Sequence, residues 1–209
     1  MSKNLNPQCK QCRRAGEKLF LKGERCNTAK CAIVKRNYPP GFHGPKGKPR
    51  LSDYGTQLYE KQKTKRMYCL LEKQFRLTFE KAKKQKGDSG KNLIKMLETR
   101  LDNTIFRLGL AASRSQARQL VNHGHFLVND IKVNIPSYIV KAGDIIKVRD
   151  SSKRSKYFKE ASGKVQKTET PSWLDFTKKD LAAKVLHVPT DEDIMMNVNT
   201  QIIVEYYSR

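Results

Sequence analysis

Four of the five cysteines stand in two short pairs near the start of the chain, in the pattern Cys9-x2-Cys12-x13-Cys26-x4-Cys31. Each short pair can present two sulfur atoms to one ion, and the intervening loop can bring the pairs together. The thiolate is the ligating form, and it is favoured by four basic neighbours, Arg13, Arg14, Arg25 and Lys30. The spacing predicts one zinc ion held by four thiolates. An iron–sulfur cluster uses the same ligands and stays open as the alternative.

Two other interpretations of these cysteines are disulfide bonds and four unrelated residues. Disulfides are rare inside cells, where we expect this chain to act. The segment around the cysteines has few apolar residues, so a metal is the cross-link that could offset its ordering entropy. We interpret the fifth cysteine, Cys69, as a small core hydrophobe on a helix beside Leu70 and Leu71.

A second group of polar side chains lies within residues 99–148. We expect Arg114, Arg118 and Gln119 to project from a short helix, with Asn129 and Lys132 at a hairpin. Cationic and amide groups on one edge suit phosphates and the minor groove of folded RNA. The alternative for each arginine is a solvated surface, and for His123 it is an interaction with the helix dipole.

The chain is strongly basic: 209 residues carry 43 Lys plus Arg against 20 Asp plus Glu, a net charge of +23. Residues 1–90 hold 23 of the basic and 7 of the acidic side chains. Solubility alone needs a net charge of about 2–8 on a small domain, so we expect a polyanionic partner, most commonly nucleic acid. The longest apolar run, Met67–Leu71, has five residues, and the first residues do not form a secretory signal. We therefore expect no membrane partner and a cytoplasmic location.

Periodicity predicts mainly helices in the first half of the chain. Residues 37–50, rich in proline and glycine, should form an extended loop. Helices are expected over 52–86, with Ser52 as N-cap, and over 91–108, separated by the breaker Gly87–Gly90.

A change to strand periodicity follows a short helix that begins with the capping box Ser113–Gln116. Asn129-Asp130 should form a two-residue hairpin turn between strands at 125–128 and 131–133, and 138–140 and 145–148 should complete a small sheet. Residues 151–170 look like polar surface. Beyond them, Trp173, Leu174 and Phe176 should contribute to a core, and 201–207 suit a closing strand or a helical end.

Several runs resemble the family of bacterial small-subunit ribosomal protein four and the RNA-binding module named after it. They are Leu97–Asn103, Ser113–His125 and Val128-Asn129 in the module, and Leu21–Cys26, Tyr38–Gly44 and Glu205–Arg209 outside it. The resemblance covers essentially the whole chain. Two positions depart from it: Asp130 stands where glycine is common, and Phe42 where glutamine is usual.

The resemblance implies an α+β fold: a helical domain carrying a small inserted helix-turn-hairpin RNA-binding module, and a metal-stabilised basic N-terminal extension. The implied domains are the extension at 1–45, the helical domain at 46–92 completed by 187–209, and the module with its α/β surroundings at 93–186.

The implied function is that of a structural constituent of the small ribosomal subunit, which binds ribosomal RNA, nucleates assembly of its 5′ domain and contributes to translational accuracy. Implied partners are that RNA, the neighbouring small-subunit ribosomal protein five, and messenger RNA where it enters the subunit. The expected RNA-binding residues are Arg13, Arg14, Arg25, Lys35, Arg36, Lys46, Lys48, Arg50, Lys63, Arg66, Arg100, Arg114, Ser115, Arg118, Gln119, His123, Gly124, Asn129 and Lys132.

Two other classes of protein carry the same module. An RNA-modifying enzyme needs a separate catalytic domain with a placed acid or base, and this chain has scattered histidines and no glycine-rich phosphate loop. We therefore expect no catalytic residue and no small-molecule substrate. A free RNA-binding regulator would not need so long a basic N-terminal segment.

Overall fold

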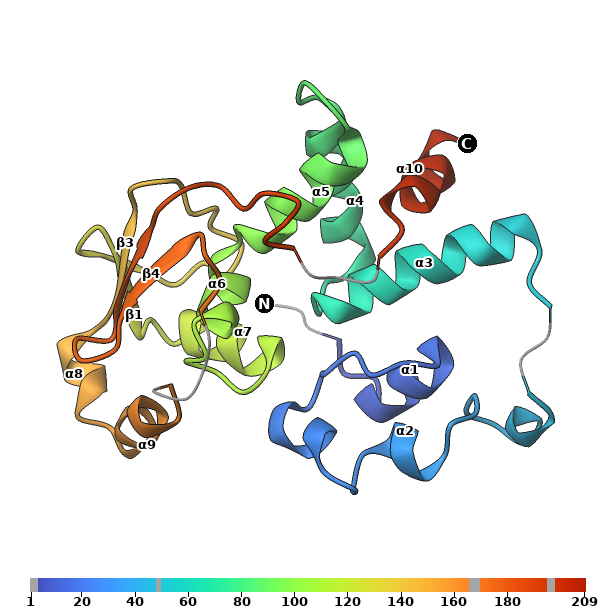
Figure 1. The fold of residues 1–209 in the computed structure, drawn as a ribbon, viewed down its shortest axis with the longest axis horizontal. Coiled ribbons are helices and arrows are strands. Elements are labelled where there is room, and N and C mark those ends of the chain that lie inside the picture. The colour runs from blue at the N-terminus through green and yellow to red at the C-terminus, as the bar shows by residue number, and fades with distance from the viewer. Residues whose placement is uncertain (1–3, 48–49, 166–169, 195–197) are drawn as a thin grey trace. The chain divides into compact units, whose positions relative to one another are not determined.

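The chain folds into two compact units in a computed structural model that describes residues 4–47, 50–165, 170–194 and 198–209. Unit 1 comprises Met1–Leu93 with Asn197–Arg209, and unit 2 comprises Ile94–Met196. The chain passes from one unit to the other within helix α5, Ser89–Glu98 (Figure 1). Segments 1–45 and 46–92 belong to the same unit. Among the described residues, no helix has both the length and the apolarity needed to cross a bilayer.

Unit 1 is helical. Its elements are α1 (Gln8–Ala15), a 3-10 turn η1 (Gly23–Asn27), α2 (Ala32–Lys35), a 3-10 turn η2 (Gly44–Lys46), α3 (Asp53–Met67), α4 (Glu72–Lys83), the start of α5, and α10 (Thr200–Ser208). As predicted, Ser52 caps α3: its Oγ accepts a hydrogen bond from the Gly55 backbone N–H at 3.2 Å.

The prediction of continuous helix over 52–86 is wrong at one place, because the chain turns between α3 and α4. Cys69 has φ 55°, the left-handed conformation that commonly ends a helix. The Cys69 N–H donates to the Arg66 carbonyl at 3.0 Å and the Leu70 N–H to the Lys65 carbonyl at 3.0 Å, which is a Schellman motif. Cysteine stands where glycine usually marks such an end, so the sequence carried no stop signal. Cys69 is thus a partly buried turn residue rather than a helical one.

The C-terminal residues form helix α10, which packs on α3 and α4 rather than joining a sheet. The Tyr207 ring stacks on Phe79 with centroids 4.6 Å apart, and its hydroxyl donates to Glu72 Oε1 at 3.1 Å. Glu72 also forms ion pairs with two lysines: its Oε1 lies 2.7 Å from Lys61 Nζ and its Oε2 lies 2.7 Å from Lys65 Nζ. Burial alone would raise the pKa of Glu72, but the two lysines outweigh it and lower that pKa to about 2. These contacts bind the last turns of the chain to residues far away in sequence.

Unit 2 combines short helices with one antiparallel sheet. The helices are the end of α5, α6 (Leu101–Arg107), α7 (Arg114–Asn122), α8 (Asp150–Lys153) and α9 (Lys156–Val165). The strands are β1 (Phe126–Val128), β2 (Ile131–Val133), β3 (Ile145–Val148), β4 (Leu174–Thr177) and β5 (Ala182–Val185), in the order β2-β1-β3-β5-β4. Asn129 (φ 50°) and Asp130 (φ 64°) make the predicted hairpin turn.

The expected helix over 91–108 is instead two helices, α5 and α6, which break at Thr99 and Arg100. The backbone there pairs with residues 138–140: the Val140 N–H donates to the Thr99 carbonyl at 2.9 Å, and the Leu101 N–H to the Tyr138 carbonyl at 2.8 Å. Segment 138–140 therefore bridges to the helix junction and is not a strand of the sheet, contrary to the prediction. A long-range pairing decided both outcomes.

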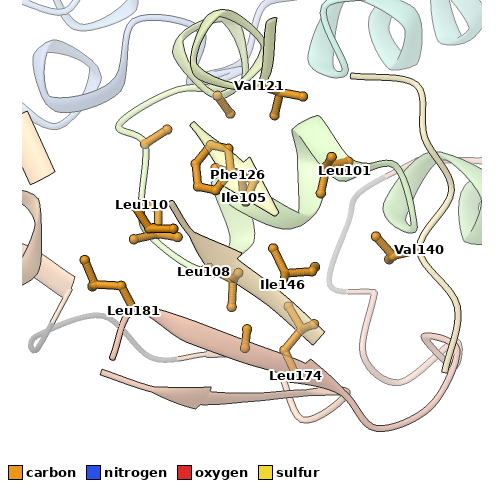
Figure 2. Close-up of a cluster of buried hydrophobic side chains, with 14 of the residues drawn as sticks. Leu101, Ile105, Leu108, Leu110, Val121, Phe126, Val140, Ile146, Leu174 and Leu181 are labelled. Atoms are coloured by element: carbon orange, nitrogen blue, oxygen red, sulfur yellow. The ribbon is translucent and has the colours of Figure 1, made fainter. Parts of the chain in front are cut away.

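The core of unit 2 lies between the inner face of the sheet and its helices (Figure 2). Leu101 and Ile105 of α6, Val121 of α7, and Phe126 and Ile146 of the sheet are almost completely buried. The predicted core residues Trp173 and Leu174 are buried as well. The expectation that 151–170 lies on the surface is wrong in part, because α9 buries Phe158 and Val165 in this core. Residues 166–169 of that segment lie outside the described residues.

Candidate nucleic-acid interface and cysteine cluster

A buried polar network joins the ends of α5, α6 and α7 in unit 2. Arg100 donates two hydrogen bonds to Asp102, from Nε to Oδ1 at 3.0 Å and from Nη2 to Oδ2 at 2.7 Å. Arg118 Nη1 lies 3.5 Å from the same Oδ2. Arg100 is 3% exposed and Asp102 5%, so their ion pair is internal, and the contact of Arg118 with Asp102 joins the start of α6 to α7.

A second carboxylate, Glu98, extends the network. Arg107 Nε and Nη2 donate to Glu98 at 2.9 and 2.8 Å, and Asn103 Nδ2 donates to Glu98 Oε2 at 2.8 Å. Arg114 Nε donates to Asn103 Oδ1 at 2.7 Å, and its guanidinium lies 4.5 Å from the Phe106 ring centroid. The expectation that Arg114 and Arg118 project freely is therefore wrong: Arg114 is buried, and only 11% of the Arg118 side chain is exposed.

The network nevertheless gives this end of unit 2 a positive surplus, because it contains four guanidinium groups and two carboxylates. A surplus of fixed positive charge attracts phosphate. Glu98, Asn103 and Arg107 are members of the network that the sequence did not mark as binding residues. The sequence feature that could have revealed them is a run of charged and amide residues inside a stripe of leucines and isoleucines, because a buried polar side chain there needs a hydrogen-bond partner.

Four expected RNA-binding positions lie along the path from α7 into the hairpin. Gln119 and His123 are exposed and Ser115 is half-buried. The Gly124 backbone has φ 71°, and a Cβ added there would lie 2.4 Å from Cε of Lys132. Because Gly124 has no Cβ, the aliphatic part of the Lys132 side chain can pack directly against its backbone. The Lys132 ammonium group then lies near the end of α7.

Asn129 belongs to the frame of the hairpin. Its Nδ2 donates to Asp144 Oδ1 at 2.8 Å, and its Oδ1 accepts from the Ile145 N–H at 2.9 Å. Both ends of the exposed amide thus connect the hairpin to the start of β3.

Lys63 and Arg66, two expected RNA-binding residues, lie on α3, and Lys63 is neutralised within unit 1. Lys63 is 5% exposed and lies 3.2 Å from Glu17 and 3.3 Å from Glu60. Burial alone would lower the pKa of Lys63, but Glu17 and Glu60 outweigh it and raise that pKa. Arg66 differs: burial, followed by the positive charge of Arg14, lowers its pKa. Arg14 and Arg66 thus form a like-charged pair, which an anion would stabilise.

The described basic residues of segment 25–50 are exposed. Between Glu24 and Asp53 the chain contains no acidic residue. In this stretch the described basic side chains are exposed: Arg25, Lys30, Lys35, Arg36, Lys46 and Arg50. Lys48 lies outside the described residues. Arg13 turns inward, because its guanidinium donates to the carbonyls of Tyr38 and Pro39 at 2.9 and 3.1 Å.

The four paired cysteines line one small pocket in unit 1. Cys9 and Cys12 lie on α1, Cys26 lies in η1, and Cys31 precedes α2, and the pocket wall also includes Leu21 and Ile33. The Lys22 N–H donates to Cys26 Sγ at 3.4 Å. All four are free thiols. Burial, followed by the charges of the three other cysteines, raises the pKa of Cys12, although a hydrogen bond from the Leu19 backbone opposes this.

These residues fit a thiolate-bound metal in their chemistry: four sulfur donors, backbone N–H groups directed at sulfur, and an apolar wall. The sulfur atoms do not stand in ligating positions. In the part of the chain that the structure describes, no three Cys, His, Asp or Glu side chains are placed to hold an ion.

Comparison with known proteins matches two successive segments of the chain to two family models. Residues 3–98 match the family described as Ribosomal protein S4/S9 N-terminal domain, and residues 99–146 match the S4 domain. Proteins called small ribosomal subunit protein uS4 are similar over their whole length and that of this chain: 54% identical in Caldicellulosiruptor saccharolyticus, 52% in Clostridioides difficile and 50% in Acetivibrio thermocellus.

Proposed function

We infer the function of this chain from the premise that it belongs, over its whole length, to the uS4 family of small ribosomal subunit proteins. The chain is a structural, non-enzymatic constituent of the small ribosomal subunit that binds ribosomal RNA, and it resides in the ribosome, in the cytoplasm of bacteria. Among the observations on the molecule itself, the exposed basic segment 25–50 without a single acidic residue supports this function best.

We propose more specifically that the chain binds the 5′ domain of the ribosomal RNA early, nucleates its assembly and contributes to translational accuracy. We propose contacts with the neighbouring ribosomal protein five and with messenger RNA where it enters the subunit. The support is the distribution of charge: exposed cations in segment 25–50, and a fixed positive surplus beside α7. Phosphate contacts from both units would hold RNA segments in a defined geometry.

Sedimentation tests membership in the particle. Purified protein added to small subunits depleted of it should sediment with the particle in moderate salt, and a transcript of the 5′ domain should bind it without other proteins. A free RNA-binding regulator would wash off the particle at the same salt concentration. A failure to bind the 5′-domain transcript alone would contradict the early role.

We also propose that the four paired cysteines hold one zinc ion, with an iron–sulfur cluster as the alternative. The support is the shared pocket of the four thiols, their spacing and the small apolar core around them. Thiolate ligation would require the sulfurs to close on the ion, which would couple the fold of this segment to metal binding.

Elemental analysis of the natively purified chain tests the metal. Cys9→Ser and Cys31→Ser should each abolish an equivalent of zinc and expose residues near the N-terminus to protease, whereas Cys69→Ser should retain both the metal and the protection. Iron with visible absorbance would replace zinc by a cluster. A metal-free native protein with a protease-resistant N-terminus would refute the site.

A further inference from the structure

Phe42 is the most exposed large hydrophobic side chain that the structure describes, at 92%. It lies in unit 1 between α2 and η2, in a loop that we define as residues 38–47 and call the Phe42 loop. A phenyl ring in water gives up the stabilisation that burial would supply. An exposed aromatic side chain in a structured loop is therefore a candidate contact for a partner.

The Phe42 loop is held in place by contacts at its base. Arg13 donates to the carbonyls of Tyr38 and Pro39, and its guanidinium lies 4.7 Å from the Tyr38 ring centroid. The Gly44 N–H donates to the Gly41 carbonyl at 3.1 Å. A Cβ at Gly44 would lie 2.0 Å from the Pro39 carbonyl oxygen, so only glycine allows the chain to approach itself this closely. These contacts fix the direction in which Phe42 leaves the loop.

The immediate neighbour of Phe42 leaves its ring accessible. The rings of Phe42 and His43 are nearly perpendicular, at 86°, with centroids 5.3 Å apart. An edge-to-face pair of this kind supports the ring from one side without forming a sandwich on it. With 92% of the residue exposed, a flat ligand can reach a face of the phenyl ring.

The charge around the loop favours one class of partner. Lys46 belongs to η2 at the end of the loop, and Arg50 follows shortly after; both are exposed, as are Lys35 and Arg36 before it. The absence of acidic residues between Glu24 and Asp53 means that these cations are not neutralised by near neighbours in the chain. An aromatic face beside exposed cations is the combination by which proteins bind nucleic acid with unpaired bases.

We propose that Phe42 stacks on an unpaired base of the small-subunit ribosomal RNA while Lys46 and Arg50 contact the phosphates beside it. This proposal rests on the proposed function and adds to it a base contact at one named residue. Because every base has a π-face, the stacking would strengthen binding without selecting a base by hydrogen bonding.

Substitutions in the full chain test the stacking, with a 5′-domain ribosomal RNA transcript as the probe. Phe42→Ala should weaken binding by about 5- to 160-fold, the range expected for loss of one base–aromatic stack. Phe42→Tyr should keep the affinity, whereas Phe42→Leu, which is apolar but not aromatic, should not. The matched control is Leu5→Ala, which removes another strongly exposed apolar side chain of unit 1 (82%) and should bind like the unsubstituted chain.

Salt dependence separates stacking from charge. Phe42→Ala should lower affinity by the same factor at every salt concentration, because it removes no phosphate contact. Lys46→Gln should reduce the slope of log affinity against log salt by about one. A Phe42→Trp chain should also change its fluorescence on binding the transcript; the unsubstituted chain, whose single tryptophan is the buried Trp173, is the blank.

The outcomes distinguish this proposal from the proposed function. If the unsubstituted chain does not bind the transcript, the proposed early RNA binding fails. If it binds and Phe42→Ala or Phe42→Leu binds equally well, the stacking is overturned and the function stands. The stacking is also overturned if Phe42→Ala weakens binding to an unstructured RNA oligonucleotide but not to the transcript. It is likewise overturned if the only defect of Phe42→Ala lies in contacts with neighbouring proteins.

Discussion

Asp102 is the residue on which two arginines of unit 2 depend. Its carboxylate is 7% exposed and accepts from Arg100 while Arg118 approaches the same oxygen. A buried pair adds little net stability when intact, but removal of one partner leaves an uncompensated charge inside the protein. Residues expected to touch RNA can thus affect binding through the fold, and stability must be measured beside affinity.

Asp102→Ala should therefore destabilise unit 2 by about 3 kcal/mol. Urea unfolding followed by the fluorescence of Trp173, which is buried in the core of unit 2, measures this free energy. The matched control is Asp130→Asn, which removes the charge from the exposed ion pair with Lys147 at 3.0 Å and keeps a residue type that tolerates the positive φ of this turn. An exposed pair contributes at most about 1 kcal/mol, so equal losses in the two variants would contradict the buried-network interpretation.

His125 makes the stability of unit 2 depend on pH. Burial, followed by the positive charges of His123 and Arg149, lowers the pKa of His125. The folded state then binds fewer protons than the unfolded chain, so the stabilisation is complete above about pH 6.5 and is lost as pH falls below it.

The urea midpoint reported by Trp173 should accordingly fall between about pH 7.5 and pH 5.5. His125→Gln should flatten that dependence, and His43→Gln, at an exposed histidine of unit 1, is the control for removing a histidine. The carboxyl of Asp193, another perturbed group of unit 2, has a pKa of about 2 and titrates below this window. A slope unchanged by His125→Gln would assign the pH dependence to other groups.

Among the elements, helix α7 connects the buried network to the exposed positions. Ser113 caps it, since the Gln116 N–H donates to Ser113 Oγ at 3.3 Å. Gln116 reaches back, as a capping box requires, but its Oε1 accepts from the Ala112 N–H at 2.9 Å, one residue before the cap. The helix start is thus tied to the loop that precedes it.

Ser113→Ala should cost about 1 kcal/mol of unit 2 stability, because an N–H at the helix start loses its acceptor. Ser115→Ala is the matched control two residues later, within the helix, and should change stability by less than about 0.5 kcal/mol. The Trp173 urea midpoint measures both. Indistinguishable variants would show that the Gln116 contact alone holds the helix start.

For the whole molecule, the net charge of +23 governs the strength and the salt dependence of RNA binding. The structure reduces the number of cations available to bind RNA, because Lys61, Lys63 and Lys65 are paired with glutamates inside unit 1. The exposed cations of segment 25–50 remain directed to solvent.

If those cations contribute to about 6–10 phosphate contacts, affinity for the 5′-domain transcript should drop ~10³–10⁵-fold between 50 and 200 mM salt. Filter binding over a salt series measures the slope. Lys35→Gln combined with Arg36→Gln should reduce the slope by about two. A nearly flat dependence would show that positive charge does not carry the binding.

The amino-acid sequence by itself determined the features that depend on neighbours along the chain. The basic charge, the family motifs, the Ser113 cap and the Asn129-Asp130 turn are set by local residue types, and the structure confirms the cap and the turn. The cysteine spacing predicts a metal on the same local grounds.

Tertiary structure alone decided which of these side chains face solvent. Helix periodicity marks a polar side, but it does not tell a solvated arginine from one held by Asp102 or Asn103 of another helix. The turn at Cys69 is local, but no glycine marks it in the sequence. The break at Thr99, in contrast, follows from a pairing with residues 138–140. That pairing and the burial of the arginines depend on groups distant in sequence, whose proximity exists only after the chain has folded.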